Sequence, residues 1–249
     1  MAKQKGIIKL EGTMDDVNFY YWKGKPCARK AGGGFNGERI KNSSTMVRVR
    51  ENYSEFGNCS KVKSSLKASL HPFLNAYREG ELHGRMMQLL QQIKACDMIS
   101  ERGKRTVGNG IGTSMGRMLF QQFEFTPNRS VSKTLMGIGS FDWDTYSYSV
   151  SRFFINDVVF PLSATHFEVS FGVLNFDFAT LNYKLFMGTP LLLDRDFVDS
   201  SFSLRPKDLP VVGGKEFAFV GLKFYQEVNG TKYLLQNESA IGLEVVGVR

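Results

Sequence analysis

The chain has 249 residues, of which 42% are hydrophobic and 22% are charged. This composition excludes wholesale disorder, and the length allows one large β domain or two smaller domains with a sizeable core. No run approaches the ~18 apolar residues of a membrane-spanning helix, and the first residues lack the apolar stretch of a signal peptide, so we expect cytoplasmic synthesis without membrane insertion. Three cysteines without a Cys-x-x-Cys pair exclude a disulfide framework and a zinc site.

The net charge of +8 is distributed unevenly along the chain. Residues 1–130 contain 22 Lys and Arg against 11 Asp and Glu, a net charge of +11. Residues 131–249 contain 10 against 13, a net charge of −3. A basic half joined to a mildly acidic half indicates a polyanionic partner or a head-to-tail assembly with complementary surfaces. The alternative interpretation is ordinary solvated surface charge.

Residues 1–42 are predicted to form a β-rich arm. Gly6–Thr13 and Val17–Trp22 are rich in β-branched and aromatic residues, so each is expected to be a strand, and Cys27–Arg29 is expected to be a third. So small a sheet is marginal by itself and must pack on the helices that follow or on a neighbouring subunit. The candidate assembly residues of the arm are Ile7, Ile8, Leu10, Phe19, Tyr20, Tyr21 and Trp22.

Residues 43–105 are predicted to form a small helical bundle with a basic surface. The first helix is capped by serine and ends at Gly57, a second begins near Ser60 and is kinked or split at Pro72, and a third covers about Gly80–Cys96. The apolar stripes expected to face inward are Met46, Val49, Tyr53 and Phe56; Val62, Leu66, Leu70, Phe73 and Tyr77; and Leu82, Met86, Leu89, Leu90 and Ile93.

The polar, glycine-rich residues 106–117 are predicted to be a linker. Within them, Gly108–Gly116 superficially resembles a phosphate-binding loop. It lacks the Lys-Ser/Thr ending of such a loop, and it does not join a clear strand to a clear helix. A flexible linker is the favoured interpretation.

Residues 118–249 are predicted to form an antiparallel β-sandwich, which makes the whole chain α+β. Apolar and aromatic runs alternate with turns, and Asn229-Gly230 is the strongest hairpin signal. The expected strands are Met118–Phe125, Phe141–Val150, Asp157–Phe160, Ala164–Phe171, Asn175–Phe178, Tyr183–Met187, Glu216–Gln226, Lys232–Gln236 and Ile241–Val248.

No residue spacing in the sequence marks an enzyme. His71, His83 and His166 show neither metal-ligand spacing nor a triad motif, so we expect structural roles for them. The acidic clusters Asp142–Asp144 and Asp194–Asp199 are candidates for calcium, yet neither has the glycine or the closing glutamate of an EF-hand loop. Solvated loops are the favoured interpretation, and we expect no catalytic residue, no metal and no cofactor.

The basic helical segment is the largest functional signal in the sequence. Its cations would hold nucleic acid by neutralising phosphates without reading the base sequence. Alternatively, they only form surface ion pairs and keep the chain soluble. The candidate nucleic-acid-binding residues are Arg48, Arg50, Lys61, Lys63, Lys67, Arg102, Lys104 and Arg105.

Several short segments near both ends of the chain form a recognisable pattern. They are Gly6–Thr13, Phe19-Tyr20, Ala28–Lys30, Arg39–Asn42, Arg50–Asn52, Glu55–Gly57 and Phe224–Gly230. In these segments the chain resembles a family of proteins of similar length from Bacteroidota genomes, which has no assigned activity. Tyr53 and Cys59–Val62 depart from the smaller, glycine-rich sequence expected there. The resemblance implies one architecture over the whole chain rather than a fusion of unrelated parts, and it implies no activity.

Two functions from different classes follow. The first hypothesis is a non-enzymatic structural protein that self-assembles, or joins other structural subunits, in a particle, a filament or a virion-like or phage-like body, inside or outside the cell. The strands of the arm would add to a sheet edge of a neighbour. The alternative is a sequence-independent DNA-binding or other nucleic-acid-binding protein that uses the basic helical segment. Carbohydrate recognition through Trp143, Tyr146 and Tyr148 ranks last because it depends on fold analogy.

Overall fold

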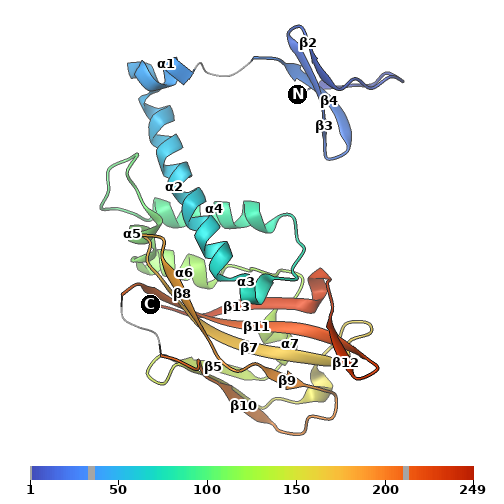
Figure 1. The fold of residues 1–249 in the computed structure, drawn as a ribbon. Coiled ribbons are helices and arrows are strands. Elements are labelled where there is room, and N and C mark those ends of the chain that lie inside the picture. The colour runs from blue at the N-terminus through green and yellow to red at the C-terminus, as the bar shows by residue number, and fades with distance from the viewer. Residues whose placement is uncertain (1, 33–36, 210–212) are drawn as a thin grey trace. The chain divides into compact units, whose positions relative to one another are not determined.

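The computed structural model describes residues 2–32, 37–209 and 213–249 (Figure 1). The chain divides into two compact units, Met1–Arg50 and Glu51–Arg249, which we call the N-terminal unit and the C-terminal unit. The N-terminal unit contains β1 (Ala2–Lys3), β2 (Gly12–Met14), β3 (Val17–Trp22), β4 (Lys25–Lys30), α1 (Gly37–Asn42) and a 3-10 turn at Ser44–Met46. Its strands form one antiparallel sheet in the order β1-β4-β3-β2, here called the N-terminal sheet.

Two of the three strands predicted for the arm are present. Val17–Trp22 is β3, and Cys27–Arg29 lies within β4. The prediction for Gly6–Thr13 is wrong, because only its last two residues belong to a strand. Residues 4–11 instead connect β1 and β2, which lie at opposite edges of the sheet. The Gln4 side chain bonds to both the amide and the carbonyl of Leu10, at 2.8 and 3.2 Å, and so ties this connection together.

Helix α2 (Val47–Ser69) is one unbroken helix of 23 residues. The predicted helix end at Gly57 is therefore wrong. A glycine inside a helix costs about 1 kcal/mol, and burial of residues on one side of α2 outweighs that cost. The buried side consists of Glu55, Cys59, Val62, Lys63, Leu66 and Ser69.

Of the predicted stripe Met46, Val49, Tyr53 and Phe56, Met46 is buried and Val49 is half-buried, but the last two residues face solvent. Tyr53 is 79% exposed and Phe56 is 55% exposed. The charged Glu55, which the hydrophobic pattern placed outside, is buried. The partners of that carboxylate, Lys94, Gly103 and Arg105, lie far along the chain, so no local pattern predicts its burial.

The proline prediction is confirmed. Helix α2 ends at Ser69, and Pro72 lies in the first turn of the short helix α3 (His71–Leu74). The third predicted helix is α4 (Leu82–Ala95). Lys223 donates from Nζ to the carbonyl of Pro72 at 2.6 Å, which fastens α3 to the sheet beneath it.

The glycine-rich segment predicted to be a linker instead forms two helices, α5 (Val107–Ile111) and α6 (Ser114–Gln121). The side chains of Thr106 and Thr113 cap their N-termini. The glycines permit close packing, because a Cβ on Gly110 would lie 1.9 Å from the Ile93 carbonyl oxygen in α4. The strand predicted at Met118–Phe125 is wrong, because its first residues belong to α6.

The rest of the C-terminal unit is α+β with antiparallel sheets. Strands β5 (Ile138–Asp142), β6 (Ser147–Ser151) and β10 (Ser201–Leu204) form a three-stranded sheet in the order β10-β6-β5. The larger sheet contains β7 (His166–Phe176), β8 (Tyr183–Met187), β9 (Leu191–Leu193), β11 (Lys215–Val228), β12 (Thr231–Leu234) and β13 (Ile241–Val248). The remaining elements are α7 (Val131–Leu135) and 3-10 turns at Ile155–Asp157 and Glu238–Ala240.

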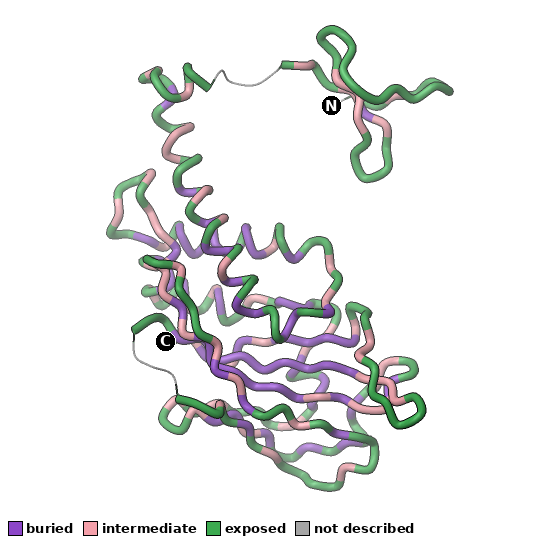
Figure 2. Tube along the Cα trace, viewed as in Figure 1, coloured by how far each residue is buried: buried purple, intermediate pink, exposed green. Residues whose placement is uncertain are grey.

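The larger sheet is covered on both faces. In β11, Phe217 and Phe219 pack with the helices. Residues of the other face of the strand, Ala218, Val220 and Leu222, pack with the three-stranded sheet. Figure 2 shows the result: β7 and β11 are buried along most of their length, whereas the N-terminal sheet is largely exposed. Helices, larger sheet and smaller sheet thus form three layers around two cores.

Several predicted strand boundaries of this half are confirmed. Tyr183–Met187 is β8, Ile241–Val248 is β13, and Asn229-Gly230 turns between β11 and β12 with positive φ at both residues. Others are wrong. Phe141–Val150 is a hairpin of β5 and β6, Ala164–Phe171 and Asn175–Phe178 merge into β7, and Asp157–Phe160 is not a strand. A strand buried on both faces lacks the alternation that reveals its length.

Candidate functional site

The basic helical segment contains a buried carboxylate that binds two of its cations. Glu55 Oε2 accepts from Lys94 Nζ at 2.6 Å and from Arg105 Nη2 at 3.0 Å, and Glu55 Oε1 accepts from Arg105 Nε at 2.9 Å and the Gly103 amide at 2.7 Å. Burial by itself would raise the pKa of Glu55, but these hydrogen bonds dominate and lower it to about 2. The carboxylate is therefore ionised, and its role is to join α2, α4 and the loop after α4.

A second buried carboxylate organises the same loop. Asp97 accepts from the backbone amides of Ile99 and Ser100, both at 3.0 Å, and from the Thr106 amide at 2.9 Å. Although burial opposes ionisation, these hydrogen bonds lower the pKa of Asp97 below its ordinary value. Hydrogen bonds to the carboxylates of Glu55 and Asp97 thus fix the conformation of the loop that carries Arg102, Lys104 and Arg105.

The candidate nucleic-acid-binding residues differ in burial and in their partners. Lys63 is buried and lies 2.8 Å from His83 Nδ1, and burial, followed by the charge of Lys67, lowers its pKa. Arg105 is held by Glu55. The other pairings are Arg102 with Glu51 at 3.2 Å, Lys104 with Glu101 at 3.0 Å, and Arg50 with the carbonyls of Ile40 and Ser43 at 2.6 and 2.9 Å. Arg48, Lys61 and Lys67 are exposed.

The N-terminal sheet has two chemically different faces. Directly paired residues of antiparallel strands project to the same side, and the register pairs Met14 with Val17, Phe19 with Ala28, and Tyr21 with Pro26. We call this side the apolar face; its members are Ala2, Gly12, Met14, Val17, Phe19, Tyr21, Pro26, Ala28 and one cation, Lys30, which is paired with Val17. The opposite side, the aromatic–basic face, contains Lys3, Thr13, Asn18, Tyr20, Trp22, Lys25, Cys27 and Arg29.

The candidate assembly residues divide between three places. Phe19 and Tyr21 lie on the apolar face, and Tyr20 and Trp22 lie on the aromatic–basic face. Ile7, Ile8 and Leu10 are exposed residues of the connection between β1 and β2. The run of four aromatics in β3 hides this division in the sequence, because alternation of apolar with polar residues is the usual sign of a two-faced strand.

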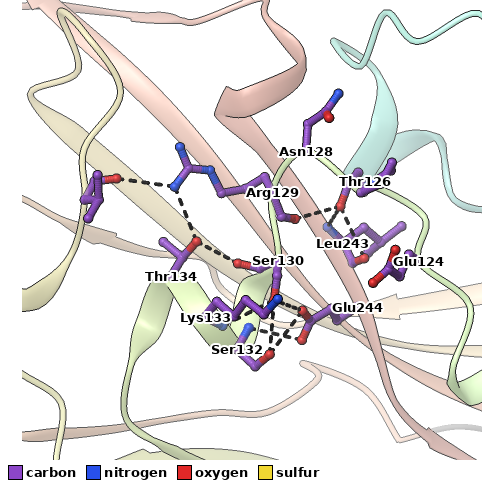
Figure 3. A pocket seen from close by; sticks show the side chains of 12 residues that line it. Glu124, Thr126, Asn128, Arg129, Ser130, Ser132, Lys133, Thr134, Leu243 and Glu244 are labelled. Atoms are coloured by element: carbon purple, nitrogen blue, oxygen red, sulfur yellow. Dashed lines mark hydrogen bonds between the residues drawn. The ribbon is translucent and has the colours of Figure 1, made fainter.

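The C-terminal unit has a polar recess of about 530 Å³ where the loop before α7 meets β13 (Figure 3). On one side the Ser130 hydroxyl donates to Glu244 at 2.6 Å, and the Ser132 amide and hydroxyl donate to the same carboxylate at 3.1 and 3.2 Å. On the other side Arg129 Nε donates to the Ser239 carbonyl at 2.6 Å. Burial lowers the pKa of Arg129.

The serine and glutamate side chains of the recess are bonded to each other and to the start of α7. The Ser130 oxygen also accepts from the Lys133 amide as the N-cap of α7, so the hydroxyl is held by the helix start as well as by Glu244. A nucleophilic serine needs a base that takes its proton and a third group that orients the base. No histidine lines the recess, and no reaction follows from its geometry. Sequence reasoning did not single it out, because Arg129 and Glu244 are far apart in the chain.

Within the described residues, His83, His166 and the acidic clusters each have partners of their own. His83 contacts Lys63, and His166 Nε2 lies 3.4 Å from Glu227. Asp142 and Asp194 each accept a backbone amide two residues ahead, at 3.0 Å, in a tight turn. Among the described residues, no group of three or more His, Cys, Asp and Glu side chains is placed to hold a metal ion.

The aromatic residues considered for carbohydrate recognition are buried or contact another side chain. Tyr148 is buried. Arg249 lies 4.7 Å over the centroid of the Trp143 ring and donates to the Tyr146 hydroxyl. The three rings therefore do not form one open platform.

A scan of protein-family models found no match to the chain, and searches of the curated proteins and of the solved structures found none either. The resemblance noted from the sequence remains a prediction. Within the ranges that the structure describes, no helix has the length and apolar character needed to cross a membrane.

Proposed function

We propose that the chain is a non-enzymatic structural subunit that assembles with further copies of itself into a larger particle, filament or virion-like body. The observation that carries this proposal is the apolar face of the N-terminal sheet. Among the described residues of the N-terminal unit, only Cys27 and Met46 are buried. On the apolar face, Met14, Val17 and Tyr21 are exposed.

An uncovered apolar face on so small a sheet favours a partner. Two-sided exposure leaves the sheet without a core of its own, and small sheets become stable only when a face is packed. Full burial of a large apolar side chain contributes about 1.5–3 kcal/mol. Several such residues on one face therefore supply enough driving force for an intersubunit contact.

Sheet edges in the C-terminal unit offer a second mode of contact. Within the described part of the chain, β5 and β10 each pair with β6 only, so each has one open edge. Natural edge strands are commonly protected by charge or proline, and β10, with the sequence Ser-Phe-Ser-Leu, contains neither. Such an edge supports strand addition from a neighbouring arm.

The helical segment gives the alternative function little support. The alternative needs Lys63 and Arg105 at the surface. Lys63 is buried, and Arg105 forms an ion pair with the buried Glu55. Lys61 and Lys67 are the lysines of α2 that remain exposed. A phosphate-binding surface built on α2 would depend mainly on these two lysines and on Arg48, which is also exposed.

Size-exclusion chromatography with light scattering at physiological salt tests the assembly. The native chain is expected to form oligomers whose mass rises with concentration. The double variant Val17→Lys, Tyr21→Lys places charges on the apolar face and is expected to be monomeric. The matched control Asn18→Lys, Trp22→Lys adds the same charge to the same strand, β3, with the same spacing but on the opposite face, and is expected to assemble. A native chain that stays monomeric at high concentration contradicts the proposal.

A further inference from the structure

The positive charge of the protein belongs almost entirely to the N-terminal unit. Residues 1–50 contain 11 Lys and Arg against 4 Asp and Glu, a net charge of +7. Residues 51–249 contain 21 against 20, a net charge of +1. Of the net +11 of residues 1–130, +7 therefore belongs to this small unit, which includes Arg48 and Arg50 of the helical segment, and +4 belongs to residues 51–130.

Cations and aromatic rings share one side of the N-terminal sheet. Lys25 is paired with Trp22, Arg29 with Asn18, and Lys3 with Cys27, which is itself paired with Tyr20. Lys3, Lys25 and Arg29 are exposed, and Trp22 is 56% exposed. The Arg29 guanidinium lies 5.3 Å from the centroid of the Tyr20 ring. The aromatic–basic face thus presents rings with positive charges directly beside them.

We propose that the aromatic–basic face binds single-stranded nucleic acid. Proteins that bind single strands without sequence preference combine cations that follow the phosphates with aromatic rings on which bases stack. Here the Trp22 ring would stack on a base, and Lys25, Arg29 and Lys3 would neutralise the flanking phosphates. The face is separate from the apolar face, so assembly and nucleic-acid binding use opposite sides of one sheet.

The composition of the face distinguishes a single strand from other polyanions. A duplex keeps its bases stacked inside, so Trp22 would have no base to stack on. Only the cations of the face would then contribute to binding. A lipid surface favours aliphatic side chains that insert beside the cations, but Met14 and Val17 lie on the other face. Exposed unpaired bases are the chemistry that uses both the rings and the charges.

The fluorescence of Trp22 reports stacking directly. The chain has two tryptophans, so Trp143→Phe in the full-length protein leaves Trp22 as the only one. Addition of oligodeoxythymidylate is expected to quench this fluorescence, whereas heparin and anionic phospholipid vesicles are expected to leave it largely unchanged. Duplex DNA of the same length is expected to bind more weakly than the single strand.

Affinities of variants, measured by the anisotropy of a labelled oligodeoxythymidylate, separate stacking from charge. Trp22→Leu is expected to weaken binding by roughly 5- to 150-fold, the usual range for one stacked base. Lys25→Gln with Arg29→Gln is expected to reduce the slope of log affinity against log salt by about 1.4, since each phosphate contact on a single strand contributes about 0.7. The control Lys61→Gln with Lys67→Gln removes the same charge from α2 and is expected to keep native affinity.

Four outcomes overturn the proposal: no binding of the oligonucleotide at low salt, equal affinity for duplex, equal quenching by heparin or vesicles, or loss of binding in the α2 control as large as in the Lys25, Arg29 variant. Because Trp22, Lys25 and Arg29 are exposed, their replacement is expected to leave the fold intact, which circular dichroism checks for each variant.

Discussion

The N-terminal sheet and the larger sheet of the C-terminal unit use similar residues with opposite results. Both are antiparallel and rich in aromatic side chains. In β11, Phe217 and Phe219 are fully buried between layers, whereas in β3 the aromatic side chains are half-buried or exposed. The two sheets thus use residues of similar strand propensity. They differ because layers of the same chain cover the larger sheet on both faces, whereas the N-terminal sheet is largely exposed. A sheet that its own chain covers provides stability, and a sheet left open provides contact surfaces.

The largest expected effect comes from removing a ring from the covered sheet. Phe219 is fully buried and contacts the rings of Phe73, Phe120 and Phe125, with centroids 5.9–6.4 Å apart. Phe219→Ala is expected to reduce the free energy of unfolding by about 3–5 kcal/mol in urea denaturation. Tyr21→Ala in the open sheet is expected to change it by no more than about 0.5 kcal/mol. Equal losses in the two variants would remove the distinction between the sheets.

The buried carboxylate of α2 is expected to matter nearly as much. Glu55→Gln leaves Lys94 and Arg105 without a counter-charge, and removal of one partner from a buried ion pair costs about 3–5 kcal/mol. Glu101→Gln breaks the exposed ion pair with Lys104 and is expected to cost less than about 1 kcal/mol. Denaturant titration at neutral pH compares the two. A loss for Glu55→Gln no larger than for the control would show that the buried network does not stabilise the helical layer.

The same carboxylate predicts how acid affects stability. The folded pKa of Glu55, about 2, lies below its ordinary value of 4.5. A lowered folded pKa means that the contribution is complete above pH 4.5 and is lost as the pH falls from 4.5 toward 2. The loss attributable to this group is about 3 kcal/mol. Denaturation midpoints measured across this range are expected to fall less steeply in Glu55→Gln than in the native chain, and parallel curves would contradict the assignment.

A pair of glycine substitutions tests the packing of the helical layer. Gly110→Ala forces a methyl group against the Ile93 carbonyl and is expected to destabilise by about 1–3 kcal/mol. Gly57 lies in the middle of α2, and a Cβ added there meets no atom within 4 Å. Gly57→Ala is therefore expected to stabilise the protein by about 0.5–1 kcal/mol. Thermal unfolding of the two variants should shift in opposite directions.

Local signals account for the elements that sequence reasoning located well. The Asn229-Gly230 dipeptide favours the positive φ values that a tight hairpin requires, and it gives β11 and β12 their register. Pro72 ends α2 because it lacks an amide donor and restricts the residue before it. Helix α4 has an apolar stripe of helical period with Leu82, Met86 and Ile93 all buried.

The candidate sites were harder to predict because each depends on residues distant in the chain. Arg105 was placed at a binding surface from its charge alone, but Glu55, fifty residues earlier, holds it. Lys63 was expected on an exposed helix face and is buried against His83 of α4. For the arm, the sequence predicts that the four aromatic residues of β3 serve assembly together, but only the pairing of β3 with β2 and β4 divides them between two faces.

The sequence by itself determined the turns, the proline break, several strands and the excess of positive charge near the N-terminus, because these follow from the backbone preferences of single residues or from simple counts. Only the tertiary structure decided that the glycine-rich segment is helical, that α2 continues through Gly57, and that Glu55 rather than Tyr53 faces inward. Local preferences differ by about 1 kcal/mol per residue, whereas burial of one large side chain contributes about 1.5–3 kcal/mol. Where the two disagree, contacts between distant segments set the outcome.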